Sequence, residues 1–238
     1  MNPSGNTFMD RYLIPIAVIL GAVIIALALM FNHGAQAVQK AATAGNPATP
    51  AVNIANVKTA GEPFIGSANA PVTMALFYDY QCPYCKQFDA NVTPQLYTNY
   101  VQTGKLKIIF KDFDFLGPNS IQASEFERAV WALYPDQFYA WFNAVFAGQL
   151  AESRTADASY LPHLQQITST IPGIDVTKVL ALMNQNKAQY DADITNSFTE
   201  GQADGITGTP SVIIGTTLLQ GGQSYAAVAA VVDAQLKK

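Results

Sequence analysis

Cys82-Pro83-Tyr84-Cys85 contains both cysteines of this 238-residue chain, and its spacing limits the chemistry that the chain can perform. Two residues between cysteines are typical of a redox-active disulfide or of half of a four-ligand metal site. A tetrahedral structural zinc site would need two further cysteine or histidine ligands. The chain offers only His33 and His163, which are isolated in the sequence. The cysteine pair therefore favours redox chemistry over metal binding.

A strand and a helix are expected on either side of the cysteines. Val72 to Tyr78 (VTMALFY) is a short apolar run that suits a buried central strand. Lys86 to Tyr100 carries large apolar residues at helical spacing, and Pro94 should kink this helix. Cys82 would then lie at a helix N-terminus, where free N–H groups and the helix dipole stabilise an anion. We therefore expect a lowered pKa at Cys82, which makes it the nucleophile, with Cys85 resolving mixed disulfides.

Pro83 fits this arrangement, because the first turn of a helix leaves its backbone nitrogen without an intrahelical acceptor. A purely structural disulfide is the alternative interpretation of the pair. Such a bond would close a very small loop, and closing a small loop restricts the unfolded chain little. We therefore interpret the two cysteines as catalytic.

The chain from Pro71 onward is typical of one α/β domain. A second strand is expected over Leu106 to Phe110. Residues 119–200 then carry apolar groups at three- and four-residue steps, which predicts a block of helices. Two short strands separated by Gly215 suggest a hairpin, and Ala226 to Leu236 closes the chain as a helix. This order favours a single α/β domain with a helical insertion over two separate domains.

The N-terminal part of the chain predicts a membrane segment. Residues 13–31 (LIPIAVILGAVIIALALMF) are 19 residues without a charge. This length is about enough to cross a ~30 Å hydrocarbon layer at ~1.5 Å per helical residue. Residues 1–33 are therefore assigned as a membrane anchor or a signal segment. A cleavage site is expected after Ala37 if the segment is a signal, but signal cores usually span only about 7–15 apolar residues, which favours a retained anchor.

The remaining composition places the domain and limits its partners. Residues 34–62 are rich in Ala, Thr, Asn, Gly and Pro and predict a flexible linker, which leaves 63–238 as the folded domain. Because disulfides persist in oxidising compartments, we expect a single-pass protein of the cytoplasmic membrane whose domain faces the periplasm or cell exterior.

The net charge of the chain is −4, and the sequence contains no run of basic residues. No nucleic-acid partner is expected, because phosphate binding needs a concentrated positive surface.

Several segments resemble one known family. Phe77 to Cys85 (FYDYQCPYC) resembles the active-site strand and helix start of thioredoxin-fold proteins of the bacterial DsbA-like type. Gly205 to Ser211 (GITGTPS) is similar to the family segment whose proline is cis and faces the dithiol. The resemblance covers about residues 62–238 and implies a thioredoxin fold with a helical insertion at about 119–200. Together with residues 13–31, the resemblance predicts a thiol:disulfide oxidoreductase domain that follows one N-terminal transmembrane helix. Such an enzyme needs no cofactor.

The resemblance also implies supporting site residues, namely Pro83, Tyr84, Thr209 and Pro210. A proline at the head of a strand marks an edge or a special turn, because it has no N–H for the sheet ladder. A cis peptide before Pro210 would leave the Thr209 backbone free to pair with an extended substrate segment beside Cys82.

Two positions depart from the family pattern. Leu76 lies six residues before the first cysteine, where related proteins carry a buried acid that assists proton transfer. Asp79 is the nearest carboxylate in the sequence and is our candidate for this role, and a solvated aspartate at the strand end is the alternative. Tyr84 stands where strong oxidants carry histidine, and tyrosine cannot carry a positive charge. We therefore expect a less oxidising couple than in the Pro-His proteins.

Three functions remain open. An extracytoplasmic dithiol oxidase would donate the Cys82–Cys85 disulfide to exported proteins with cysteines, and the family implies reoxidation by a quinone-linked membrane partner. A reductase or isomerase of the DsbG type is favoured by Tyr84 and Thr209, although residues 34–62 are too short for the dimerisation domain of such isomerases. A tethered peptide-binding module with a structural disulfide is the third. We favour the oxidase.

Overall fold

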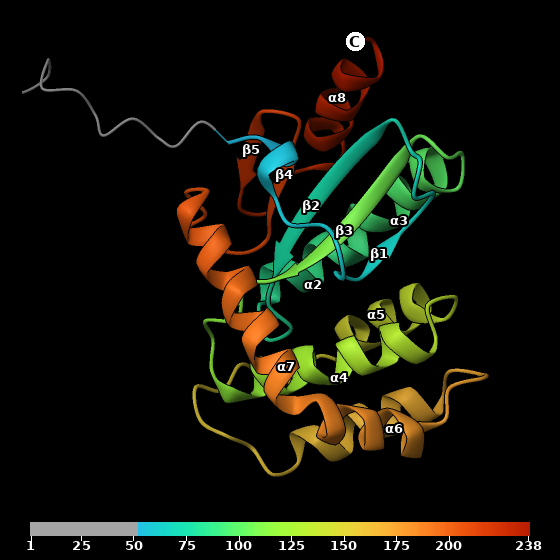
Figure 1. Cartoon of the computed structure of the whole chain (residues 1–238), viewed down its shortest axis with the longest axis vertical. Helices are drawn as coiled ribbons and strands as arrows, with labels where there is room; N and C mark the ends of the chain where they lie inside the picture. The colour runs from blue at the N-terminus through green and yellow to red at the C-terminus, as the bar shows by residue number, and fades with distance from the viewer. Residues whose placement is uncertain (1–51) are drawn as a thin grey trace, which may run out of the picture. The chain divides into compact units, whose positions relative to one another are not determined.

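A five-stranded mixed sheet forms the centre of the chain in the computed structural model, which describes residues 52–238 (Figure 1). The strands lie in the order β1-β3-β2-β4-β5. β2 pairs in parallel with β3 and antiparallel with β4, and β4 and β5 form the expected hairpin. The strands are β1 (Phe64–Ile65), β2 (Val72–Tyr78), β3 (Leu106–Asp112), β4 (Ser211–Ile214) and β5 (Thr217–Gln220).

β2 is the central strand, and its two faces contribute to two separate cores. Met74, Leu76 and Tyr78 belong to the larger core. Ala75 and Phe77 belong to a smaller core on the opposite face. Because strand side chains alternate between faces, an almost uniformly apolar strand must be covered on both sides. The apolar run over residues 72–78 predicted this burial correctly.

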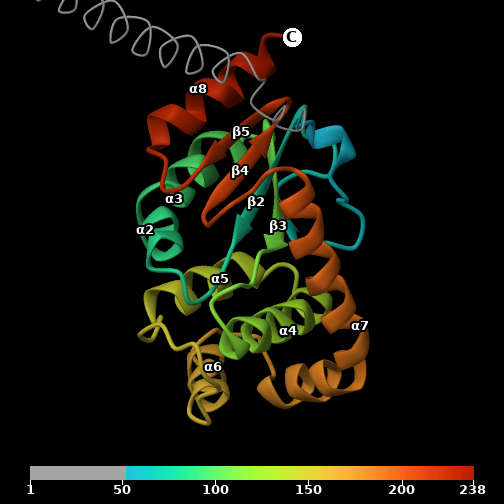
Figure 2. The same ribbon diagram turned by 90° about the vertical axis from the view of Figure 1, so that its left-hand side faces the viewer.

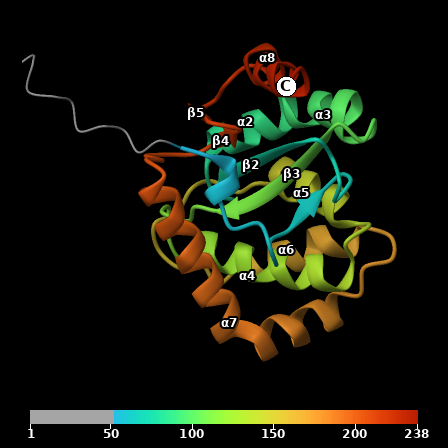
Figure 3. The ribbon, with the colours of Figure 1, turned by 45° about the horizontal axis from the view of Figure 1, so that its top comes forward.

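Helices cover both faces and one end of the sheet. α2, α3 and α8 lie on one face, and the C-terminal part of α7 lies on the other (Figures 2 and 3). α4, α5 and α6 gather at the end toward which β2 and β3 point (Figure 2). The helices are α2 (Pro83–Asn91), α3 (Thr93–Leu96), α4 (Pro118–Leu133), α5 (Phe138–Ala147), α6 (Tyr160–Ser169), α7 (Val176–Ala203) and α8 (Tyr225–Leu236).

The order of the elements confirms the expected fold. A strand, a helix and a parallel strand are followed by four helices, α4 to α7, and then by the hairpin and the last helix. The helical block therefore interrupts an α/β unit of the thioredoxin type as an insertion between β3 and β4. This placement brings the insertion to the end of the sheet at which β2 leads into the cysteines.

The helix that follows the cysteines is not continuous, so the prediction of one kinked helix over 86–100 was wrong. α2 ends at Asn91, and α3 begins at Thr93. Pro94 lies in the first turn of α3, where a missing N–H costs nothing. Its ring would clash with the carbonyl one turn earlier in an unbroken helix, so the chain ends one helix and begins another. Tyr97–Val101 then continues as a π-helical turn.

The predicted membrane segment, residues 13–31, lies outside the described residues, and so does the start of the linker. Within residues 52–238, no helix has both the length and the apolar character needed to cross a membrane. The last part of the expected linker packs against the domain. Val52 and Val57 are buried in the smaller core, and the Ile54 N–H donates to the Gly215 carbonyl at 2.7 Å. Apolar residues spaced five apart were too weak a signal to reveal this packing.

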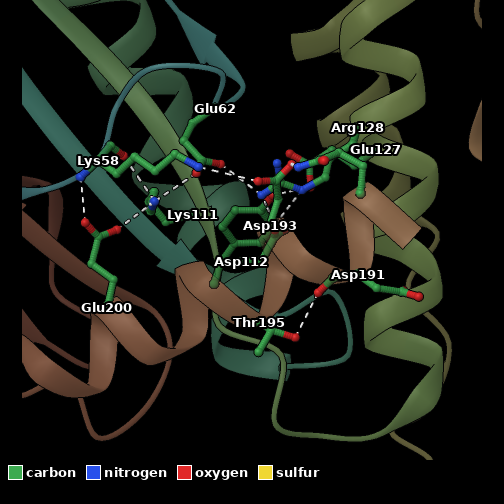
Figure 4. A network of polar contacts seen from close by, with 12 residues as sticks. Lys58, Glu62, Lys111, Asp112, Glu127, Arg128, Asp191, Asp193, Thr195 and Glu200 are labelled. Carbon is green, nitrogen blue, oxygen red and sulfur yellow. Dashed lines mark hydrogen bonds and ion pairs between the residues drawn. The ribbon is translucent and has the colours of Figure 1, made fainter. Parts of the chain in front are cut away.

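A buried network of ion pairs joins β3, α4, α7 and the segment before β1 (Figure 4). Arg128 of α4 donates from Nε to Asp112 Oδ2 at 3.0 Å and from Nη2 to Glu62 Oε2 at 2.9 Å. Lys111 Nζ lies 3.0 Å from Glu62 Oε1 and 2.8 Å from Glu200 Oε2. Because each buried charge has an opposite partner, the network fixes the insertion against the sheet.

Replacing Arg128 by methionine should lower the free energy of unfolding by about 3–5 kcal/mol, because it leaves the buried Asp112 carboxylate without its cation and Glu62 with Lys111 alone. Urea denaturation at neutral pH measures this change. The matched control is Lys178→Met, whose pair with Asp175 is exposed, with side-chain accessibilities of 70% and 47%. The control should cost about 1 kcal/mol or less. Equal, small effects of the two substitutions would contradict a stabilising role of the network.

Candidate active site

The two cysteines lie where β2 leads into α2. Cys82 is the residue before the first turn of α2, and Cys85 lies within that turn. Pro83 occupies the first helical turn, as expected. Both cysteines are free thiols, and their fractional exposures are 4% and 3%. Exposure therefore does not distinguish the two sulfurs. Tyr84, which lies between the cysteines in the sequence, is 60% exposed.

Acidity distinguishes the two thiols. The pKa of Cys82 is lowered to about 6, first by a hydrogen bond from the Cys85 thiol and then by contacts with Thr209 and with the N–H groups of Cys85 and Tyr84. Burial opposes this shift and is outweighed. Burial raises the pKa of Cys85 well above its ordinary value. The helix start therefore contributes to the acidity of Cys82, as the sequence predicted, but the Cys85 thiol contributes most.

The segment before β4 faces the dithiol from the other side. The Thr209–Pro210 peptide is cis, as the resemblance implied. The Cys82 thiol lies 3.4 Å from the Thr209 carbonyl oxygen, to which it donates a hydrogen bond. Pro210 lies beside Cys85 in the wall of an inner void. The structure thus brings together the four predicted residues Cys82, Cys85, Thr209 and Pro210.

Asp79 is neither solvated nor free. Its Oδ1 accepts from the Gln81 N–H at 2.8 Å and from Ser120 Oγ at 2.6 Å. Its Oδ2 accepts from the N–H groups of Phe115 and Leu116 at 3.1 and 3.0 Å. Burial raises the pKa of this carboxyl, while the four hydrogen bonds act in the opposite direction. The alternative of a solvated aspartate was therefore wrong. The role of Asp79 in proton transfer stays a prediction. Within residues 52–238, no hydrogen bond joins the Asp79 carboxylate to a thiol.

The helical insertion holds the backbone of the active-site turn with further polar contacts. Gln149 Nε2 donates to the carbonyl oxygens of Tyr80 and Cys82 at 2.7 and 3.0 Å. Gln81 Nε2 donates to Ser120 Oγ at 2.9 Å, and the Ser153 N–H donates to Gln81 Oε1 at 2.9 Å. These contacts could not be predicted from the sequence, because their partners lie far apart in the chain.

A narrow inner void lies behind Cys85, and it has no room for a water molecule. Cys85 and Asp89 of α2, Leu76 of β2 and Pro210 all line it. Asp89 is 7% exposed, and burial raises the pKa of its carboxyl to about 7. Sequence reasoning missed Asp89, although its position four residues after Cys85 places it on the same face of the helix.

The acidity of Cys82 can be tested by following thiolate absorbance against pH in the reduced protein. The midpoint should lie near 6, with the thiolate present above that pH. Cys85→Ala should raise the midpoint, because it removes the largest contribution to the lowered pKa. A wild-type midpoint of about 8.5, the value of a free cysteine, would contradict this assignment.

Comparisons with known proteins agree with the geometry. The family model described as Thioredoxin matches residues 58–234. Disulfide bond formation protein D of Bacillus subtilis is 25% identical over 178 residues, covering 74% of this chain and 78% of that protein. A probable protein of the same name from Bacillus anthracis is also 25% identical, over 73% of this chain and 78% of that protein.

Solved structures show the same architecture. Oxidised BdbD from Bacillus subtilis matches with a TM-score of 0.67 at 22% identity, covering 76% of this chain and 96% of that chain, which supports the fold. The thiol-disulfide exchange protein alpha-DsbA2 from Wolbachia pipientis matches with a TM-score of 0.61 at 28% identity, over 73% of this chain and 86% of that chain. Family model, relatives and paired cysteines point to the same chemistry: the chain belongs to the thioredoxin family and is a thiol:disulfide oxidoreductase.

Proposed function

We propose that this protein is a dithiol oxidase that donates the Cys82–Cys85 disulfide to exported proteins outside the cytoplasm. The observation that carries the proposal is the unequal acidity of the two thiols. The lowered pKa of Cys82 stabilises the reduced, thiolate form of the pair. A couple whose reduced form is stabilised accepts electrons more readily, and this is the property of an oxidant. The name of the Bacillus subtilis relative, a disulfide bond formation protein, agrees with this direction.

The reaction begins when a substrate thiolate attacks the Cys82 sulfur of the oxidised pair. The Cys82–Cys85 bond breaks, a mixed disulfide forms between the substrate and Cys82, and the electron pair goes to Cys85. A second substrate thiolate then attacks the substrate sulfur of the mixed disulfide and releases Cys82. Cys82 is a good leaving group, because a thiolate of low pKa leaves readily. The substrate is oxidised by two electrons, and the pair is reduced by two.

The surface around the dithiol suits a protein substrate. Tyr84 is exposed beside the pair. Phe115 and Leu150 are further exposed apolar side chains, on segments that bond the active-site turn through the Phe115 N–H and through Gln149. The Thr209 carbonyl lies next to the Cys82 sulfur and offers a main-chain acceptor to an extended segment. We assign Pro83, Tyr84, Thr209 and Pro210 supporting roles around the reacting sulfurs.

Residues 13–31 are proposed as the membrane anchor that holds this domain on the outer side of the cytoplasmic membrane. Their support is the uncharged length of the segment, which suits a single span. A quinone-linked membrane protein is proposed as the partner that reoxidises the pair, because an oxidase needs an electron acceptor after each turnover.

A reductase or isomerase of the DsbG type is the second candidate. Tyr84 and Thr209 favour it, since neither supplies a positive charge near the Cys82 thiolate. A tethered binding module with a structural disulfide is the third candidate, and the lowered pKa of Cys82 speaks against it, because a structural bond needs no reactive thiolate.

The redox state of the full-length protein in intact cells separates these candidates. Acid quenching followed by a thiol-reactive mass tag should show a mostly oxidised pair. A mostly reduced pair would contradict the oxidase and favour the reductase. After mild reduction, a membrane-impermeant tag should label Cys82 in cells with a permeabilised outer envelope and an intact inner membrane. Absence of labelling there, with labelling after lysis, would contradict the extracytoplasmic location.

The variant Cys82→Ser should abolish oxidation of a reduced two-cysteine peptide by the purified full-length protein. The matched control is Ser67→Ala, on an exposed turn before β2, which should keep the wild-type rate. Activity that survives Cys82→Ser would contradict both redox functions and favour the binding module.

A further inference from the structure

The buried thiol of Cys85 needs a partner for proton exchange. Burial raises its pKa well above the ordinary value, yet Cys85 must lose its proton when it closes the disulfide and regain one when the disulfide opens. The proton cannot pass through the void behind it, because that void is too narrow for water. On this inner side of the thiol, only a protein group can exchange a proton with Cys85.

Asp89 is the one carboxylate among the residues that line this void. It lies one helical turn after Cys85 on α2, and residues four apart on a helix have Cβ atoms only about 5–6 Å apart. This spacing places the Asp89 carboxyl and the Cys85 thiol beside one another on the wall of the void. Asp89 Oδ1 is buried without a hydrogen-bond partner in residues 52–238, so no existing bond must break.

The other polar groups near the void are less suited to this task. Tyr78 lines it, but its hydroxyl donates to Glu127, and burial holds the pKa of Tyr78 well above its ordinary value. Thr93 also lines the void, and its hydroxyl donates to the Phe88 carbonyl at 3.5 Å. The Asp79 carboxylate is held by four hydrogen bonds to other groups.

We propose that Asp89 is the internal proton acceptor and donor of Cys85, replacing on α2 the acid that Leu76 of β2 does not provide. This inference rests on thiol–disulfide exchange at the pair. When the disulfide closes, the Cys85 proton moves to the Asp89 carboxylate, and the Cys85 sulfur attacks Cys82 and displaces the partner thiolate. When a substrate thiolate attacks Cys82, the electron pair of the broken bond goes to Cys85, and protonated Asp89 returns the proton.

The surroundings of Asp89 suit an exchange near neutral pH. The ionisable groups that face it are Cys85 on its own helix, Tyr78 on β2 and Tyr139 on α5. No lysine, arginine or histidine belongs to the residues that line the void. Without a nearby cation, burial raises the pKa of Asp89 to about 7, so both protonation states are populated at physiological pH.

The test follows the reduced full-length protein as it reacts with oxidised glutathione, with acid quenching and mass analysis. The first step, attack by Cys82 to form the glutathione mixed disulfide, reports on Cys82. The second step, attack by Cys85 to release glutathione, reports on the proposed proton transfer. Asp89→Asn should leave the first step unchanged and slow the second about 10²-fold at pH 7, so that the mixed disulfide accumulates.

The pH profile of the second step separates proton transfer from a structural effect. In the wild type, the rate should rise with pH and level off near pH 7, because the unprotonated carboxylate is the active form. This inflection should disappear in Asp89→Asn and persist in Asp89→Glu. The matched control, Asn91→Asp, adds a carboxylate on the exposed side of the same helix and should change neither step.

A second step in Asp89→Asn that keeps the wild-type pH profile and a rate within twofold of the wild type would overturn the proposal. Failure of the first step in the wild-type protein would instead contradict the assignment of Cys82 as nucleophile. Thermal melting of each variant shows that it is folded. Asp89→Asn should melt no lower than the wild type, because it removes a buried carboxylate that has no cationic partner among the lining residues.

Discussion

The buried carboxylate of Asp79 holds the active-site turn in place. It accepts four hydrogen bonds, one from within its own turn and three from the segment that begins the helical insertion. These bonds fix the end of β2 to the start of α4, so the turn that carries Cys82 has one position relative to the insertion. Gln149 holds the same turn from the far side through the carbonyls of Tyr80 and Cys82. A buried acceptor left unsatisfied is costly, so the whole set must form together.

This fixed turn explains why two nearly equally buried thiols behave differently. With the turn held, Cys82 lies at the open start of α2 and receives the Cys85 thiol and backbone N–H groups as hydrogen-bond donors. Cys85 faces inward, toward Asp89 and the narrow void, where no water can hydrate a thiolate. One thiol is therefore prepared as a nucleophile and leaving group. The other depends on an internal acid, and the ion pairs of Arg128 and Lys111 keep the insertion in place around both.

Features encoded by neighbouring residues could be predicted from the sequence, and features that depend on distant segments could not. The strand over 72–78, the helix start at Pro83 and the hairpin at Gly215 follow from local spacing and from proline and glycine chemistry. The burial of Asp79 could not be predicted, because its partners Ser120 and Leu116 lie 41 and 37 residues away. In the sequence, Asp89 resembles a solvent-facing residue of an amphipathic helix, because the helix that covers it, α5, lies far away in the chain. The break between α2 and α3 depends on Pro94, whose effect was expected as a kink.

The reduction potential of the Cys82–Cys85 pair must reflect the lowered pKa of Cys82, because a stable thiolate stabilises the reduced form of the pair. Equilibration of the full-length protein with glutathione buffers at pH 7 gives this value. A Cys82 pKa of about 6 lies between the values of thioredoxin, about 7, and DsbA, about 3.5. We therefore expect a potential between about −270 mV and about −120 mV, the values of those two proteins. A potential at or below about −270 mV would contradict this expectation.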